Sequence, residues 1–441
     1  VSGGVVAVNA TGAPAHPDLD TGLADEIYDF ITDKFISGRD TDARTRGAWD
    51  LGDWTTGPTY LASNGGCVDN VSVVPEPSSW HGTHVMGTVG ELSDNGVGMA
   101  GVAPLAKVLP IRALGHCGGN TSDIADAIVW ASGGHVNGLN DNKNPAQIIN
   151  MSLGGSGRCS PTTDMGKAIA YALAKGVTVV VAAGNASEDA SGSSPASCPG
   201  AITVASHGIT GKAAFYSNFG SVVTLSAPGG GISANASATG TPVAAGFVWS
   251  AINKGTTVPT TPDYGSMAGT SQATPEVAGA AALMISARKA AGLPALTPNQ
   301  IKGLLASTVR PFPSRPAAAY GSGLLDTSAA VSKAVDPNNS TPGDTVVPLA
   351  NGILTRLPAS YGLSDTVYNL VVPAGARILT LRTIGGTGDV SLLFTRSKVP
   401  EPGPAEYSSS NIGHNEAVTL KAPAAGTYYI RGTGNPSDTA F

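Results

Sequence analysis

Short apolar runs alternate with longer amphipathic stretches from the start of the chain to about residue 335. The runs have the length of buried strands, and the stretches between them carry apolar residues at helical spacing. Strands are therefore expected at 4–8, 108–112, 148–152, 177–183 and 202–205, and helices at 122–131, 163–175 and 277–286. This alternation predicts an α/β fold in which helices cover both faces of a parallel sheet.

The pattern changes after residue 335. Residues 336–345 are turn formers without an apolar period, which is typical of a linker. Beyond them, strand-length runs are separated by Gly and Pro turns, and no helical pattern intervenes. These runs lie at 367–372, 378–381, 390–394, 418–420 and 427–430. We therefore expect a first domain at 1–335 and a small all-β sandwich at 346–441.

The composition narrows the classes of function. The net charge is −6 and no basic block is present, so nucleic acid is not expected as a partner. No uninterrupted apolar run reaches the roughly 20 residues that span a bilayer, so no membrane span is expected. The sequence opens with neither an initiating Met nor a signal peptide, and we expect a processed, exported product.

Three segments have the composition of a catalytic site. His81 opens a Gly- and Thr-rich stretch, and Ser271 stands just before an apolar helix, where backbone amides face developing negative charge. Asn185 follows a strand at the edge where ligands bind in open α/β sheets. Each residue taken alone has a plainer interpretation, as a packed histidine, a helix cap and a turn residue.

Together, HGTHVMGT at 81–88, SLGG at 152–155, AAGN at 182–185 and GTSQATPEVAG at 269–279 closely resemble the subtilase family of serine proteases, in the family's order. The resemblance implies a subtilisin-like fold and hydrolysis of peptide bonds. It assigns His81 as general base, Ser271 as nucleophile and Asn185 as oxyanion donor. A serine hydroxyl is a weak nucleophile until a neighbouring imidazole accepts its proton.

The third member of the family's triad is an Asp followed by Thr-Gly, and here the corresponding stretch reads NATG at 9–12. Aligning Thr-Gly places Ala10 at the position of the Asp. Three explanations stay open: an introduced change that suppresses self-digestion, natural loss of catalysis by drift, and a mistaken residue assignment. We favour the first or the third, because the other site residues keep matching contexts. The alternative function is an inactive protein that holds peptides in the same groove.

The resemblance also assigns two substrate-binding segments. They comprise Ser152, Leu153, Gly154, Gly155, Ala183 and Gly184. Glycines leave backbone amides open to an extended peptide, which pairs as an added strand. They also leave room for a large side chain at P1, the substrate residue before the cleaved bond. We expect broad specificity with an apolar or aromatic P1; the plainer alternative is that these glycines only serve tight turns.

The cysteines are Cys67, Cys117, Cys159 and Cys198, widely spaced and without a C-x-x-C motif, which disfavours zinc. Four free thiols and two disulfides are both possible, and an exported chain favours disulfides. Sequence alone allows three pairings. Cys159 and Cys198 follow the two substrate-binding segments, so a bridge between them clips the pocket walls together. We therefore expect Cys159–Cys198 and Cys67–Cys117.

Calcium is expected as a structural cofactor. Asp33, Asp40 and Asp42, with Asp29 nearby, offer carboxylate ligands in one loop region, although a solvated acidic loop explains them equally. The stretch SDNGVG at 93–98 resembles a second loop with which the family binds calcium through backbone carbonyls.

Residues 346–441 resemble the prepeptidase C-terminal domain of many secreted bacterial proteases. The matching stretches are YNLVVPAG at 368–375, GGTGDVSL at 385–392 and PAAGTYY at 423–429. This resemblance implies a bacterial, extracellular setting. We expect a secreted monomer whose partners are protein or peptide substrates.

Overall fold

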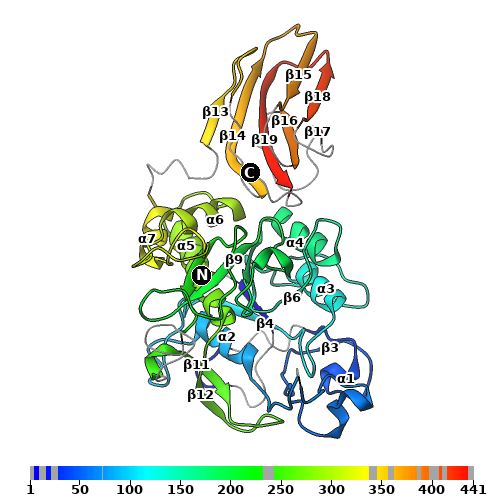
Figure 1. Ribbon diagram of the computed structural model, residues 1–441, viewed down its shortest axis with the longest axis vertical. Helices are drawn as coiled ribbons and strands as arrows, with labels where there is room; N and C mark the ends of the chain where they lie inside the picture. The colour runs from blue at the N-terminus through cyan, green and yellow to red at the C-terminus, as the bar shows by residue number, and fades with distance from the viewer. Residues whose placement is uncertain are drawn as a thin grey trace. The chain divides into compact units, whose positions relative to one another are not determined.

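The structure is a computed structural model. It describes residues 4–8, 16–20, 28–71, 73–231, 243–336, 345–355, 362–384, 389–396, 407–409 and 415–435. The chain forms two compact units, Val1–Pro337 and Asn338–Phe441 (Figure 1). Only the two end residues of the predicted linker lie within the described part. No helix among the described residues is long and apolar enough to cross a bilayer.

The first unit is built on a six-stranded parallel sheet. Across the sheet the strands are β10 (Leu225–Pro228), β9 (Ile202–His207), β7 (Thr178–Ala182), β5 (Ile148–Met151), β1 (Gly4–Val8) and β4 (Lys107–Ile111). Five of them match the predicted strands to within two residues. Only β10 lacked a sequence prediction.

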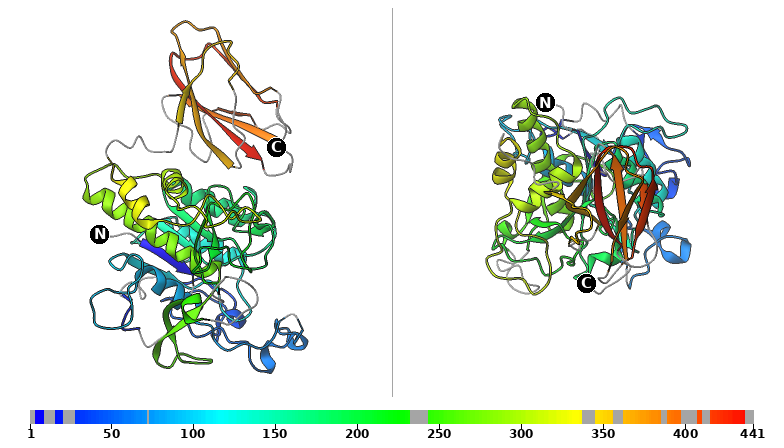
Figure 2. Two further views of the ribbon diagram at one scale, coloured as in Figure 1. Left: turned by 60° about the vertical axis from the view of Figure 1, so that its left-hand side comes forward. Right: turned by 90° about the horizontal axis from the view of Figure 1, so that it is seen from above.

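Helices cover both faces of this sheet (Figure 2). On one face lie α2 (His81–Gly90) and α5 (Thr270–Ala290), and on the other α3 (Thr121–Ala131) and α4 (Asp164–Ala174). The alternation of a strand explains the two cores: Val180 packs with the α2 and α5 side chains, whereas Val179 and Val181 pack with those of α3 and α4. The predicted α/β fold is confirmed.

The remaining helices have ten residues or fewer. They are α1 (Lys34–Ser37), α6 (Pro298–Ser307), α7 (Thr327–Ala334) and the 3-10 helices η2 (Pro58–Tyr60), η3 (Ala62–Asn64), η4 (Ala190–Gly192) and η5 (Ala244–Gly246). Helices α6 and α7 pack against α5, and Thr297 with Gln300 forms a capping box at the start of α6.

Short strand pairs shape the loops around the sheet. The hairpin of β11 (Val248–Asn253) and β12 (Pro262–Met267) packs against α2 and leads directly into α5. Two smaller antiparallel pairs are β2 (Tyr28–Asp29) with β3 (Thr45–Arg46), and β6 (Gly155–Ser156) with β8 (Ser193–Ser194). The hairpin therefore contacts α2, which begins at His81, and is continuous in sequence with the helix that carries Ser271.

The second unit is all-β within its described residues. Its larger sheet has the order β13 (Thr345–Pro348), β14 (Gly362–Val372), β19 (Gly426–Asn435), β16 (Asp389–Arg396) and β17 (Tyr407–Ser409). A second sheet pairs β15 (Ile378–Arg382) with β18 (Ala417–Lys421). Phe394, Tyr428 and Ile430 are the centre of its core. The predicted all-β region is confirmed.

Candidate active site

His81 is the first residue of α2, and the rest of this helix is buried. The residue before it, Trp80, has a φ of 53°, which sets the angle at which the chain enters the helix. Gly87 approaches β11 so closely that a Cβ there would lie 2.2 Å from Oγ of Ser250. The small residues of this motif therefore let α2 lie directly against the hairpin, which fixes the place of His81.

Ser271 lies in the first turn of α5. Its hydroxyl donates to the carbonyl of Ser152 at 3.4 Å, a long contact that is readily exchanged for another partner. Oγ of Ser152 donates in return to the carbonyl of Ser271 at 2.6 Å. The N–H of Gly269 donates to the carbonyl of Gly229 at 2.8 Å. The turn before α5 is thus held to the segments that follow β5 and β10.

Asn185 comes three residues after β7 and is oriented by Thr270. Its Oδ1 accepts from the N–H of Thr270 at 2.8 Å and from the Thr270 hydroxyl at 2.9 Å. A backbone N–H can only donate, so the amide oxygen must face Thr270 and the NH₂ group must face away. Nδ2 has no hydrogen-bond partner among the described residues. The amide is therefore held as a spare donor beside Ser271.

A cavity of about 400 Å³ lies beside these residues. It is lined by Leu153, Gly154, Gly155, Ser156, Ala182, Ala183, Gly184, Asn185, Ala186, Glu188, Ser193, Ser194, Ala196, Asn218, Thr270 and Ser271. Five of the six predicted substrate-binding residues are in this lining. The sixth, Ser152, lies behind it and bonds Ser271 as described. The lining mixes small apolar residues with hydroxyl and amide side chains, and it holds one carboxylate, Glu188.

The loop behind the cavity is shaped by Asn218, a residue that sequence reasoning missed. Its Oδ1 accepts from the amides of Ala186 and Glu188, and its Nδ2 donates to the carbonyl of Ala183. Gly184 has a φ of 109°, and a Cβ there would lie 2.3 Å from Nδ2 of Asn218. A side chain at position 184 would collide with Asn218, so glycine is required there. The sequence AAGN alone does not reveal this requirement.

Both histidines of α2 favour the neutral form. Burial lowers the pKa of His81 below its usual value, and the negative charge of Asp53 raises it in part. His84 lies three residues later, with Nε2 3.1 Å from the carbonyl of Val248, and burial lowers its pKa to about 4. An imidazole that is neutral near pH 7 can accept a proton, which is the state a general base needs.

Comparison with known sequences decides the family. Residues 2–323 match the subtilase family, and residues 365–432 match the bacterial pre-peptidase C-terminal domain. The chain belongs to the subtilase family. It is therefore a subtilisin-like serine protease, and it carries a pre-peptidase C-terminal domain.

Relatives of this subtilase are named as extracellular proteases. The extracellular protease of Xanthomonas campestris pv. campestris is 42% identical over 431 residues, which are 98% of this chain and 68% of the relative. The extracellular basic protease of Dichelobacter nodosus is 40% identical over 452 residues, 95% of this chain and 70% of the relative. A solved protease of Pseudoalteromonas arctica PAMC 21717 is 43% identical, with a TM-score of 0.66 over 76% of this chain and 90% of that one.

The position predicted for the triad carboxylate follows β1 in the sequence. This strand ends at Val8, and Ala10 lies outside the described residues. Asp18 and Asp20 follow later; Asp20 pairs with Lys107. Within the described part of this subtilase, the carboxylate whose charge acts on His81 is that of Asp53, which no sequence motif singled out.

The predicted calcium ligands Asp33, Asp40 and Asp42 are not brought together as a metal site. Asp33 Oδ1 accepts from the N–H of Phe35 at 2.7 Å and caps α1, and Asp42 Oδ1 accepts from the N–H of Lys34 at 2.9 Å. Asp40 is exposed. No group of three or more acidic, histidine or cysteine side chains that could hold a metal ion occurs among the described residues. Asp33 and Asp42 thus accept from backbone amides of α1, and their role as calcium ligands stays a prediction.

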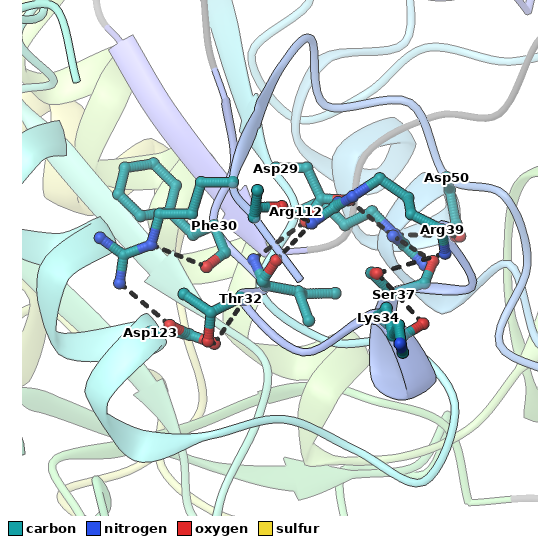
Figure 3. A network of polar contacts seen from close by, with 12 residues as sticks. Asp29, Phe30, Thr32, Lys34, Ser37, Arg39, Asp50, Arg112 and Asp123 are labelled. Carbon is teal, nitrogen blue, oxygen red and sulfur yellow. Dashed lines mark hydrogen bonds and ion pairs between the residues drawn. The ribbon is translucent and has the colours of Figure 1, made fainter. Parts of the chain in front are cut away.

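Asp29 is likewise engaged, in a buried ion-pair network (Figure 3). Arg112 directly follows β4 and is fully buried, and its Nη1 donates to Asp29 at 2.7 Å. Arg39 forms a second ion pair with the same carboxylate. On the other side of Arg112, its Nε lies 3.6 Å from Oδ1 of Asp50. The network binds the acidic loop to the end of the central sheet.

The loop at 93–98 meets a single buried carboxylate, that of Asp18. The carboxylate accepts from Asn95 at 2.6 Å, from the N–H of Met99 at 3.2 Å and from the hydroxyl of Tyr264 at 3.0 Å. Gly98 has a φ of 58°, and a Cβ there would lie 2.0 Å from Oδ2 of Asp18. No cationic side chain pairs with this carboxylate among the residues that the structure describes.

The cysteines are joined as Cys67–Cys117 and Cys159–Cys198, the pairs predicted above. The described residues contain no free cysteine. Each cysteine of the second bridge follows one of two paired strands, Cys159 after β6 and Cys198 after β8, and both strands contribute residues to the cavity lining. The bridge therefore supports the strand pair that forms one wall of the cavity.

Proposed function

We propose that this subtilase hydrolyses peptide bonds through an acyl-enzyme on Ser271. His81 takes the proton of the Ser271 hydroxyl as general base, and then returns it to the leaving amine. Nδ2 of Asn185 donates to the oxyanion of the tetrahedral intermediate, where charge develops. With Ala10, the imidazole of His81 lacks the carboxylate that the family places beside the ring nitrogen facing away from the nucleophile. The turnover of the chain as written is therefore reduced.

The observation that carries the proposal is the orientation of Asn185. Two donors of Thr270 hold its oxygen, and the adjacent residue of the same helix is Ser271. The spare NH₂ donor and the nucleophile therefore belong to one rigid unit in the lining of the cavity. Such preorganised donors need no reorganisation at the moment of reaction.

The test is covalent labelling with a serine-directed phosphonate, read by intact mass. We expect one adduct on the chain as written and none on Ser271→Ala. Ser286→Ala, on the same helix and far from the cavity, serves as the matched control and should label normally. Undiminished labelling of Ser271→Ala would contradict the assignment of the nucleophile.

A second candidate function is a pseudoprotease that holds peptides in the same groove, and Ala10 is the observation that favours it. The two candidates are separated by the Ala10→Asp variant. A protease restores labelling when the carboxylate returns. A pseudoprotease binds a peptide, detected by calorimetry, yet does not react in either form.

The substrate that the cavity accommodates best is an extended peptide with a large apolar or aromatic P1 residue. Gly155 is the first residue of β6 and Gly154 precedes it, and neither covers its amide with a side chain. The cavity volume of about 400 Å³ lies within the range of small-ligand pockets. Glu188 adds a negative charge to the lining, which disfavours an acidic P1 residue.

Calcium, which this family commonly binds as a structural ion, is proposed at Asp18 with the loop at 93–98. A buried carboxylate without a cationic partner is expensive unless a counter-charge is present. The carboxylate of Asp18 lies beside a Gly-rich loop, and carboxylate and backbone carbonyl oxygens are the ligands that calcium prefers. The ion would neutralise Asp18 and hold this loop against the β11–β12 hairpin, through which it stabilises the fold.

The setting that the relatives suggest is extracellular. We propose that the chain acts as a secreted monomer, with its peptidase domain at 1–335, a linker at 336–345 and the pre-peptidase C-terminal domain at 346–441. Size-exclusion chromatography with light scattering of the intact chain tests the monomer, and limited proteolysis tests the linker.

A further inference from the structure

Ser79, two residues before α2, is held by the carboxylate of Asp53. Oδ1 of Asp53 accepts from the N–H of Ser79 at 2.7 Å, and Oδ2 accepts from the Ser79 hydroxyl at 2.5 Å. Oγ of Ser79 in turn accepts from the N–H of His81 at 3.2 Å. A continuous chain of hydrogen bonds thus runs from Asp53 to the backbone of His81, and it satisfies an amide that the helix start leaves without a partner.

The neighbours of Ser79 are fixed on the opposite side by the turn of the β11–β12 hairpin. The N–H of Ser78 donates to the carbonyl of Thr256 at 2.8 Å. The hydroxyl of Ser78 donates to the carbonyl of Thr257 at 2.5 Å. Nε1 of Trp80 donates to the carbonyl of Gly255 at 2.6 Å. The segment is therefore clamped between the hairpin and Asp53, so that displacement of Asp53 is transmitted to His81.

Asp53 is itself anchored to the central sheet. Oδ1 of Asp50 accepts from the N–H of Gly52 at 2.9 Å, and Asp50 faces Arg112 at the end of β4 (Figure 3). The N–H of Asp53 donates to Oγ of Ser78 at 3.2 Å. Although Asp53 is partly exposed, its backbone is held from both sides. A carboxylate so placed keeps its geometry during a reaction cycle.

Asp53 is also the charge that acts on His81. Its field raises the pKa of that imidazole against the lowering effect of burial. The other titratable group near His81 on α2 is His84, which is neutral near pH 7.

Other ionisable groups stand on the elements around α2. They are Glu91 after its last turn, Lys107 on β4, Asp263 on β12, and Glu276, Arg288 and Lys289 on α5. Within the described part of the chain, none of these groups changes the pKa of His81.

We propose that Asp53 is a positioning residue for His81, which acts through Ser79 and through its own negative charge. It supplies part of the orientation and counter-charge that the family obtains from the Asp at the position of Ala10. This inference rests on the proposed function. The imidazolium formed in the transition state needs a nearby negative charge, and Asp53 is the carboxylate available to it among the described residues.

The test compares Asp53→Asn and Ser79→Ala, each in the chain as written and in the Ala10→Asp background. Asp53→Asn removes the charge and keeps the shape, whereas Ser79→Ala breaks the hydrogen-bond chain and keeps the charge. The readouts are kcat and KM on a chromogenic peptide across pH, the rate constant of phosphonate labelling, and the thermal midpoint. The matched control is Asp42→Asn, a carboxylate that accepts a backbone N–H far from α2.

We expect Asp53→Asn to lower kcat and the labelling rate on the order of tenfold, with KM unchanged. The acid limb of kcat/KM should move to lower pH, because the charge that raises the pKa of His81 is gone. Ser79→Ala should lower kcat without moving that limb. Both losses should be smaller with Asp at position 10, because that carboxylate then orients His81 and supplies the counter-charge. Asp42→Asn should behave as the parent.

The inference is overturned if Asp53→Asn keeps its labelling rate and pH profile, or if it lowers only the thermal midpoint. Equal losses in the two backgrounds would also overturn it, because Asp53 would then have no share in the role of the residue at position 10. Absence of labelling in every variant, Ala10→Asp included, would instead reject the proposed function and with it this inference. Labelling that is insensitive to Asp53 rejects the inference alone.

Discussion

Thr270 and Asn185 form a fixed pair: the N–H and the hydroxyl of Thr270 both donate to Oδ1 of Asn185, at 2.8 and 2.9 Å. The pair joins the first residue of α5 to the loop after β7, two elements that are 85 residues apart in the chain. Asn185 cannot turn over its amide without leaving a backbone N–H unpaired. The position of its NH₂ group therefore depends on Thr270 as much as on Asn185 itself.

The first prediction concerns this pair. Thr270→Val removes the hydroxyl that donates to Asn185 and accepts from the N–H of Gly184 at 3.1 Å, and it should lower kcat roughly two- to tenfold with KM unchanged. Thr274→Val is the matched control, because Thr274 is equally buried on the same helix and its hydroxyl bonds only the carbonyl of Thr270, at 2.6 Å. Steady-state kinetics of the two variants decides; equal effects would show that Thr270 acts only on stability.

The second prediction is that Ala10→Asp raises kcat strongly, because a carboxylate beside His81 orients the imidazole and stabilises its positive charge. Loss of this carboxylate alone costs about 3 × 10⁴ in kcat in a subtilisin, which sets the upper size of the gain. Asn9→Asp should not substitute, since the resemblance to the family places the carboxylate at position 10. Single-turnover acylation compares the three chains, and a gain in Asn9→Asp alone would move the triad position by one residue.

The third prediction concerns substrate preference. Peptide-library profiling should show cleavage after large apolar or aromatic residues and weak cleavage after acidic ones. Glu188→Gln should raise cleavage after acidic P1 residues roughly three- to tenfold at low salt, and less at high salt, because an exposed charge is screened. Glu76→Gln is the matched control at an exposed site outside the lining. A strict preference for Arg or Glu at P1 would contradict the proposed pocket.

The fourth prediction concerns calcium. A chelator should lower the thermal midpoint of the intact chain, because an ion bound only to the folded state stabilises it, by about 2.7 kcal/mol at a concentration 100 times Kd. Asp18→Asn should lower the midpoint in calcium and abolish the response to the chelator. Asp42→Asn should keep the response. A response that survives in Asp18→Asn would place the ion elsewhere.

The fifth prediction is a pH dependence of stability. Burial raises the pKa of Glu276 to about 7. The folded state therefore binds a proton that the unfolded state releases near pH 4.5, so the free energy of unfolding falls as the pH rises from about 4.5 to 7. Glu276→Gln has no carboxyl group to titrate, so its free energy of unfolding does not fall in this way. The variant should therefore become increasingly more stable than the parent as the pH rises from about 4.5 to 7. Chemical denaturation at several pH values measures it, with exposed Glu76→Gln as the control; a constant difference would refute the shifted pKa.

The strand and helix pattern was readable from the sequence because buried parallel strands and core helices carry continuous local signals. The runs at 148–152 and 177–183 became β5 and β7, and the helices at 122–131 and 163–175 became α3 and α4. The β11–β12 hairpin was not predicted, since its residues are mixed in polarity and its place against α2 is set by contacts far along the chain. The contacts of the acidic loop were not predicted for the same reason: Asp33 and Asp42 accept from backbone amides of α1, and their role as calcium ligands stays a prediction.

The sequence by itself determined the family, the α/β and all-β regions, and the residue types available for chemistry at His81, Asn185 and Ser271. Only the tertiary structure decided how these residues are held, because the bonds that orient them join segments distant in the chain. The clamp of Asp53 on Ser79 and the close approach of Gly184 to Asn218 are of this kind. Local patterns record propensity and burial, whereas the direction of a side chain depends on partners that only folding brings within hydrogen-bond distance.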